Sequence, residues 1–210
     1  HAQVRYFEGV HPHEVLLTDA GRAQASAARD ALGEIRFDRV VTSGLPRTIE
    51  TAQIVAPYAE PEHNHALREI ESGELRGVDP ATVQTMMTAA FRGVVPAESR
   101  FLGGESVGEF LDRLLPAFDR VLARGDWTSL LMVLHGGVNR ALLARAMTGQ
   151  RSFFGALEQL PACINIIDSG PSEWVVRSVN LAPTQWLHQH ESLTTMEKLL
   201  RQYKRRDASS

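Results

Sequence analysis

The sequence is poor in cysteine and lysine, and it contains no long apolar run. Its one cysteine, Cys163, has no second cysteine with which to form an internal disulfide, so we expect a reducing compartment and a cytoplasmic protein. The longest apolar stretches, such as residues 130–134, are far shorter than the roughly 20 residues of a membrane helix, which argues against a membrane span. No histidine and cysteine cluster has structural-zinc spacing, so we expect neither a metal nor a cofactor.

The chain also has little net charge. A formal charge of −3 at pH 7 gives no general attraction to nucleic acids or anionic membranes, so we expect neither as a partner. Any anion site must be local. Only Lys198 and Lys204 among the 22 basic residues are lysines, which leaves 20 arginines; genomic base composition explains most of them, but their guanidinium groups also suit phosphate.

Capping residues and apolar patterns divide the 210 residues into alternating strands and helices. The order predicts an α/β fold, a three-layer α/β/α arrangement with a mostly parallel central sheet, in a single domain over residues 1–210. A helical insertion at about 79–104 is expected to form a cap. We expect helices at about 19–32, 44–56, 80–91, 105–123, 138–147 and 190–206, and strands at 38–43, 129–134, 163–168 and 174–179.

Two strand-to-helix turns carry polar side chains. Arg47 follows the strand at 38–43, and His135 follows the strand at 129–134. Either residue alone is more often a surface arginine or a capping histidine. Because ligands of open α/β sheets bind at the carboxyl ends of the strands, where helix N-termini favour anions, the two together predict a phosphate pocket.

Six short segments lie in a fixed order between residue 1 and about residue 149. They are His1-Ala2-Gln3, 17–25, 42–52, Leu67-Arg68-Glu69 with Gly73, 103–106, and His135-Gly136-Gly137. In this order they resemble the motifs of the histidine phosphatase superfamily, also called the phosphoglycerate mutase-like family. Each segment alone is weak evidence for this resemblance, but the set in this order is highly specific for the superfamily.

The resemblance implies a role for several of these residues. His1 would be the nucleophile that forms a phosphohistidine, and Glu69 would be the general acid and base, with nearby Glu71 as the competing candidate. Arg47, His135 and Gly136 would bind the phosphoryl group, with His135 also counted as catalytic. The implied activity is metal-independent hydrolysis of a small phosphorylated substrate. Pairing through surface helices would give a homodimer, and the choice between monomer and homodimer stays open.

The sequence departs from the family pattern in three places. The family's arginine does not precede His1, so we expect the natural chain to continue upstream. Ala2 replaces a glycine, which leaves a non-catalytic phosphate-binding module as one alternative. A phosphomutase is the other alternative, but residues 68–73 lack the pattern of the glycolytic mutases, so a phosphatase is favoured.

Contacts with the leaving group are hardest to predict. Within the expected cap, five side chains are available for such contacts, although methionine and phenylalanine at helical spacing are more often core residues. Two close histidine pairs elsewhere lack metal-site partners and are expected in exposed loops. The five cap residues are Met86, Met87, Phe91, Arg92 and Arg100, and the pairs are His11 with His13 and His63 with His65.

Overall fold

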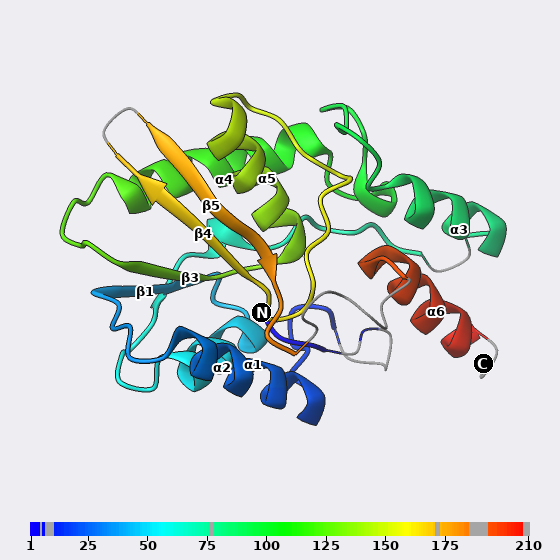
Figure 1. Ribbon diagram of the computed structural model, residues 1–210. Helices are drawn as coiled ribbons and strands as arrows, with labels where there is room; N and C mark the ends of the chain where they lie inside the picture. The colour runs from blue at the N-terminus through cyan, green and yellow to red at the C-terminus, as the bar shows by residue number, and fades with distance from the viewer. Residues whose placement is uncertain (5, 7–10, 76–77, 171–172, 185–192, 208–210) are drawn as a thin grey trace.

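A three-stranded parallel sheet forms the centre of the fold, with helices on both of its faces. The computed structural model describes residues 1–4, 6, 11–75, 78–170, 173–184 and 193–207. The strand order is β2-β1-β3, and Figure 1 shows α1 and α2 on one side of the sheet and α4 and α5 on the other. The bounds are α1 Asp19–Leu32, β1 Arg39–Thr42, α2 Pro46–Val55, β2 Glu62–His63, α4 Val107–Leu122, β3 Leu130–Val133 and α5 Gly136–Thr148.

Alternating side chains of β1 attach the two helical layers to the sheet. Val40 packs in a cluster with Ala52 of α2, whereas Val41 packs in the main core with Phe110 and Leu111 of α4. Successive side chains of a strand point to opposite faces, so both faces of β1 are buried. Helices packed on both faces of a parallel strand confirm the expected α/β class with a parallel central sheet.

Local capping explains where the helices begin and end. The Thr18 hydroxyl accepts a hydrogen bond from Gly21 N, and α1 stops at Gly33, whose φ of 61° is readily adopted by glycine. Helix α4 begins with a capping box, in which Ser106 and Glu109 satisfy each other's backbone N–H groups. The predicted helices at 19–32 and 105–123 are confirmed with small shifts at their ends.

The last two strands form a separate antiparallel hairpin. β4 (Ile164–Ser169) pairs with β5 (Trp174–Leu181), and the Trp174 ring packs on Phe118 of α4 at a centroid distance of 5.4 Å. The sequence predicted both strands but not their separation from the parallel sheet. A hairpin needs only a short connection, whereas a parallel crossover needs a dozen or more residues, so residues 170–173 permit only the antiparallel arrangement.

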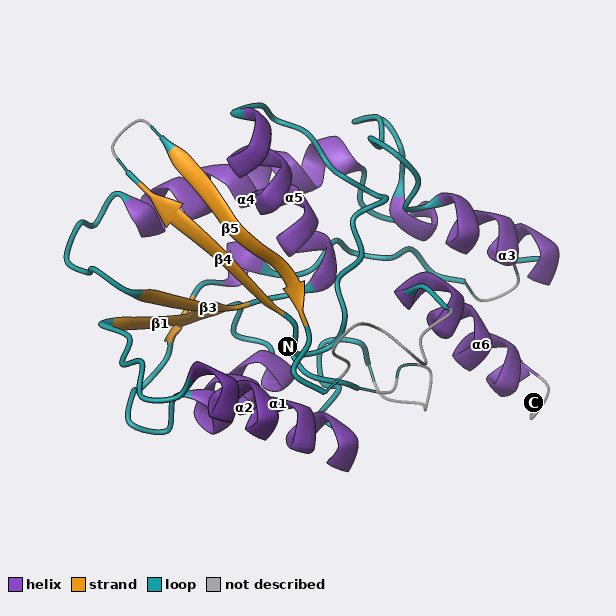
Figure 2. Cartoon of the chain, in the orientation of Figure 1, coloured by secondary structure: helices purple, strands orange, loops and turns teal. Residues whose placement is uncertain are grey.

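The expected cap packs against the C-terminal helix. α3 (Pro80–Ala89) and the 3₁₀ turn η2 (Phe101–Gly103) share an apolar cluster with α6 (Thr195–Asp207), and Figures 1 and 2 show α3 and α6 side by side. The predicted helix at 190–206 thus begins at Thr195, and its expected first residues, 190–192, lie outside the described part. Within the described ranges, no helix has both the length and the apolarity needed to cross a membrane.

Candidate active site

His1 lies where the carboxyl ends of the central strands meet. Its α-amine donates to Leu134 O, just after β3, at 2.7 Å, and its carbonyl accepts from Ala162 N at 3.0 Å. Its ring Nδ1 lies 2.7 Å from Ala2 O. A carbonyl can only accept, so Nδ1 carries the proton, and in the neutral ring the lone pair is on Nε2. This tautomer gives His1 an unprotonated nitrogen at the cavity that it lines.

The structure shows no conformational cost for alanine at position 2, where the family pattern has glycine. Ala2 is fully buried in an apolar cluster with Val4 and Leu17, and it is not among the non-glycine residues with positive φ in the described chain. Its N–H donates to Thr51 Oγ1 at 3.2 Å. The extra methyl group therefore packs in the core without backbone strain.

Arg47 and His135, predicted to share a pocket, lie at the same cavity. Only 3% of Arg47 and 1% of His135 is exposed. Arg47 Nη1 donates to Pro12 O at 2.8 Å, whereas Arg47 Nε and His135 Nδ1 are buried and have no hydrogen-bond partner among the described residues. Buried polar atoms are nearly always paired, so the unpaired Nε–H donor of the buried Arg47 guanidinium fits an anionic ligand.

A chain of hydroxyl groups determines the tautomer of His135. The Thr48 hydroxyl donates to Leu45 O at 2.7 Å, so the Ser43 hydroxyl, 3.1 Å away, donates to Thr48 Oγ1. Ser43 Oγ lies 2.8 Å from His135 Nε2 and must therefore accept from it. Burial, and then the charge of Arg47, hold the pKa of His135 well below its usual 6.5. In the ligand-free protein His135 is neutral, with its proton on Nε2.

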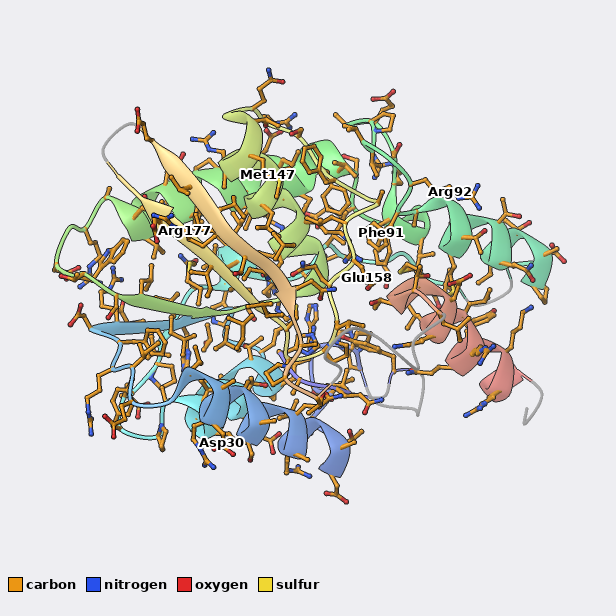
Figure 3. The ribbon with its side chains drawn as sticks, in the orientation of Figure 1. Asp30, Phe91, Arg92, Met147, Glu158 and Arg177 are labelled. Carbon is orange, nitrogen blue, oxygen red and sulfur yellow. The ribbon has the colours of Figure 1, made fainter. Side chains whose placement is uncertain are left out.

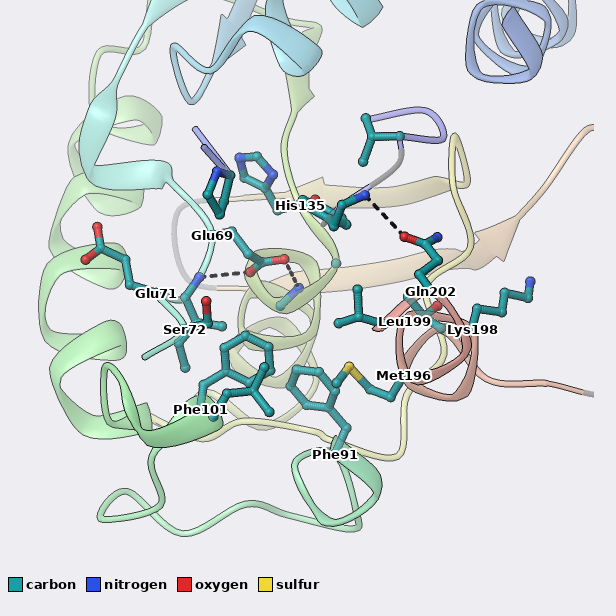
Figure 4. Close-up of a pocket in the computed structure, with 18 of the residues that line it drawn as sticks. Glu69, Glu71, Ser72, Phe91, Phe101, His135, Met196, Lys198, Leu199 and Gln202 are labelled. Atoms are coloured by element: carbon teal, nitrogen blue, oxygen red, sulfur yellow. Dashed lines mark hydrogen bonds between the residues drawn. The ribbon is translucent and has the colours of Figure 1, made fainter. Parts of the chain in front are cut away.

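Glu69, and not Glu71, has its carboxylate inside the site. Glu69 Oε1 accepts from Ile70 N at 3.0 Å, and Oε2 accepts from Gly137 N, in the first turn of α5, at 2.9 Å. In Figure 4 the Glu69 carboxylate lies close to His135, whereas the Glu71 carboxylate points away. Glu71 instead lies 3.5 Å from the Arg68 guanidinium. The geometry thus favours Glu69 between the two sequence candidates.

Two residues that the sequence analysis missed hold Glu69 in place. Arg113 of α4 donates to the carbonyls of Ala66, Arg68 and Glu69 at 2.8–3.0 Å and to the Glu105 carboxylate at 2.7–2.8 Å. A Cβ atom on Gly137 would come within 2.3 Å of Glu69 Oε1, so only glycine leaves room for the carboxylate. No local sequence signal links these residues, since Arg113 and Gly137 are 44 and 68 positions from Glu69.

A cavity of about 1510 Å³ joins these groups. His1, Arg47, Glu69, His135 and Gly136 all line it, so the structure brings together every residue that the sequence placed in the site. Gly136 also begins α5, whose N-terminus favours anions.

The other sequence candidates divide between the cavity and the surface. Phe91, His11 and His13 line the cavity, whereas Met87 is core and Arg92 and Arg100 do not face it; Figure 3 shows Arg92 projecting outward. His63 and His65 are exposed, as predicted. His11 is also exposed but His13 is partly buried, so the expectation for that pair holds only in part.

Within the described ranges, no group of three or more histidine, cysteine, aspartate or glutamate side chains could hold a metal ion. Cys163 also lines the cavity, but burial raises its pKa to about 11, so it is a neutral thiol and a poor nucleophile near neutrality.

Comparisons with known proteins agree with this geometry. Residues 1–182 match the model of the Histidine phosphatase superfamily (branch 1). The chain is 31% identical over 150 residues to Phosphoglycerate mutase-like protein 4 of Arabidopsis thaliana, with 66% of this chain and 63% of that protein covered. It is 30% identical over 160 residues to a Probable 2-carboxy-D-arabinitol-1-phosphatase of the same plant, with 74% and 33% covered. The chain therefore spans less than two thirds of the length of either relative.

A solved structure supports the same fold. The mycobacterial glucosyl-3-phosphoglycerate phosphatase superposes with a TM-score of 0.71, at 24% identity, over 87% of this chain and 96% of that one. At this identity the likeness extends to the fold alone. The names of these similar proteins include both phosphatases and a mutase-like protein.

Proposed function

The chain belongs to the histidine phosphatase superfamily, and on this premise we propose that it is a metal-independent phosphatase of a small phosphomonoester. The observation that carries the proposal is the tautomer of His1, whose Nδ1 proton is held by Ala2 O so that Nε2 keeps its lone pair. A neutral imidazole nitrogen at an anion pocket is a competent nucleophile toward phosphorus.

The first step transfers the phosphoryl group to His1. Nε2 attacks phosphorus, the P–Nε2 bond forms, and the bond between phosphorus and the ester oxygen breaks in line with it. Glu69, which must carry a proton for this step, gives it to the departing oxygen. The guanidinium of Arg47 and the ring of His135 stabilise the charge on the phosphoryl oxygens.

The second step releases phosphate. Glu69, now a carboxylate, takes a proton from a water molecule while the water oxygen attacks phosphorus. The P–Nε2 bond breaks, and its electron pair returns to His1. In the structure the Glu69 carboxylate accepts two backbone N–H groups, which orients it as the base of this step.

A phosphatase and a phosphomutase differ in the group that accepts the phosphoryl group from phosphohistidine, which is water in a phosphatase. Residues 68–73 read Arg-Glu-Ile-Glu-Ser-Gly, without the segment that helps the glycolytic mutases to hold a bisphosphorylated intermediate. A mutase would return the phosphoryl group to a second hydroxyl of the substrate, so measuring free phosphate against transferred phosphate distinguishes the two.

Hydrolysis of p-nitrophenyl phosphate in excess EDTA tests the proposal. We expect turnover that resists the chelator, that disappears in His1→Ala, and that falls by about 10²-fold in Glu69→Gln. Glu71→Gln is the matched control and should retain activity, because its carboxylate points away from the site. Full activity in Glu69→Gln would refute the assignment of the acid, and phosphate binding without phosphohistidine would indicate a non-catalytic module.

A further inference from the structure

The cavity continues well beyond the phosphate pocket. Its volume of about 1510 Å³ exceeds the roughly 300–1,000 Å³ typical of pockets for small ligands, so a phosphoryl group fills only a minor part. The remainder lies between α6 and Leu75, Val78, Phe91, Phe101 and Leu102. This space can receive the alcohol part of an ester bound through its phosphoryl group.

Apolar side chains line this second part of the cavity. Met196 and Leu199 face it from α6, three positions apart and so on one face of the helix. Figure 4 shows Phe91 and Phe101 below the Glu69 carboxylate, with Met196 and Leu199 beside them. Phe91 and Phe101 stack at a centroid distance of 5.6 Å, which holds both rings in place. Leu75 and Val78 complete the lining.

The charges around this space disfavour a second anionic group on the substrate. The carboxylate residues Glu71, Glu74 and Asp79 line the opening and are exposed. Two cations also line the cavity here. Figure 4 shows Lys198 extending away from Phe91 and Phe101. Arg140 is buried, with its guanidinium 4.8 Å from the Phe91 ring centroid and 3.7 Å from Glu158 Oε1. The Arg140 guanidinium is thus already engaged by the Phe91 ring and by Glu158, although its Nε has no hydrogen-bond partner among the described residues.

The α6 wall belongs to a part of the chain that the family match does not include. The match ends at residue 182, and α6 begins at Thr195. The phosphate-binding groups all lie inside the matched range, whereas Met196 and Leu199 lie outside it. One wall of the second part of the cavity therefore comes from outside the matched range, whereas Phe91 and Phe101 lie within it.

We propose that Leu75, Val78, Phe91, Phe101, Met196 and Leu199 form a subsite for an apolar, uncharged alcohol group of the phosphomonoester. This inference rests on the proposed function, since it takes the ester to be bound through its phosphoryl group at His1. The substrates it selects are phosphate esters of aryl-substituted or branched alkyl alcohols, and the product is an apolar alcohol.

Three esters with one common skeleton test the subsite. Propyl phosphate, 3-phenylpropyl phosphate and 3-carboxypropyl phosphate share an alkyl alcohol leaving group, so differences in leaving-group acidity are small. We expect kcat/KM for the phenyl ester to exceed that for propyl phosphate by at least about tenfold, and the carboxylate ester to be the poorest of the three. A preference for the carboxylate ester would overturn the proposal and would indicate that Arg140 binds a second anion.

Adjacent leucines of α6 provide matched variants. Leu199 lines the cavity, whereas Leu200 packs only in the cluster between α3 and α6. We expect Leu199→Asn to lower the phenyl-to-propyl ratio of kcat/KM by about tenfold, and Leu200→Asn to leave that ratio and the activity unchanged. Thermal unfolding of both variants identifies any loss caused by misfolding. An unchanged ratio in folded Leu199→Asn would overturn the subsite.

The outcomes separate this inference from the function on which it rests. Hydrolysis of all three esters through phosphohistidine, with no preference for the phenyl ester, would refute the subsite alone. If no ester is hydrolysed, the proposed function fails. Calorimetric binding of benzylphosphonate and methylphosphonate then still tests the subsite, because equal affinities for these stable analogues would overturn it.

Discussion

The protonation state of His135 makes phosphate binding dependent on pH in a defined way. In the ligand-free protein Nε2–H donates to Ser43, so Nδ1 of the neutral ring carries only a lone pair. A phosphate dianion at Nδ1 would then meet an acceptor where it needs a donor. We predict that binding takes up one proton, shared between His135 Nδ1 and a phosphate oxygen.

The size of the pH dependence of phosphate affinity follows from the number of protons taken up on binding. The pKa of His135 lies well below 6.5 in the free protein, so near neutrality the bound state holds one proton more than the separated partners. Binding that takes up one proton loses about tenfold in affinity, or about 1.4 kcal/mol, for each pH unit. Between pH about 7.5 and about 9, where phosphate is mainly a dianion, affinity should therefore fall more than tenfold.

Calorimetry of inorganic phosphate binding in buffers of different ionisation enthalpy measures this proton directly. His135→Asn, which keeps Arg47, should remove most of the proton uptake and flatten the pH dependence. Ser43→Ala should also reduce it, because Nδ1 can hold the proton once Nε2 loses its acceptor. Affinity that stays constant from pH about 7.5 to about 9 in the unmodified protein would refute the tautomer.

Further substitutions test other parts of the site. Gly137→Ala should displace the Glu69 carboxylate, because the new Cβ would lie 2.3 Å from Oε1, and should lower kcat by up to about 10²-fold in steady-state kinetics. In Arg113→Lys, the single ammonium group cannot bind three carbonyls and a carboxylate at once, so kcat should fall more than KM rises. An unchanged kcat would show that Glu69 does not need these contacts. The pKa of His135 is depressed in the folded state, so below pH about 6.5 only the unfolded state gains a proton on this residue. The free energy of unfolding should therefore fall by up to about 1.4 kcal/mol per pH unit as the pH drops below that value. Urea unfolding measures this fall, which should be smaller in His135→Asn.

The fold could be predicted where a local rule determined each element. Thr18 and Gly33 bound α1, the apolar run at 129–134 marks β3, and the valine pair within 38–43 marks β1. β2 was missed because Glu62–His63 is two exposed polar residues, paired only because β1 lies beside them. The antiparallel pairing of the hairpin was also missed, since apolar patterns identify strands but not their partners.

The site could be predicted only in part, for a related reason. Arg47 and His135 each follow a recognisable strand, so topology alone places them at the same edge of the sheet. Glu69 was preferred to Glu71 because its spacing to Gly73 resembles the family pattern, but its contact with Gly137 N, 68 positions away, could not be predicted. The tautomer of His135 depends on Ser43, Thr48 and the Leu45 carbonyl acting together, and no spacing rule describes such a chain of hydrogen bonds.

The two parts of the cavity differ in how the sequence specifies them, and this difference has a functional consequence. The phosphate-binding residues lie at strand ends and helix starts, where small displacements would break short hydrogen bonds. Substitutions of these residues should therefore abolish phosphoryl transfer. α6 contacts α3 through a hydrogen bond from Lys204 to Gln84 and through an apolar cluster that includes Phe101. Apolar contacts tolerate changes of side-chain shape at modest cost. Substitution along α6 can therefore change which alcohol is accepted while His1, Arg47 and Glu69 keep their geometry.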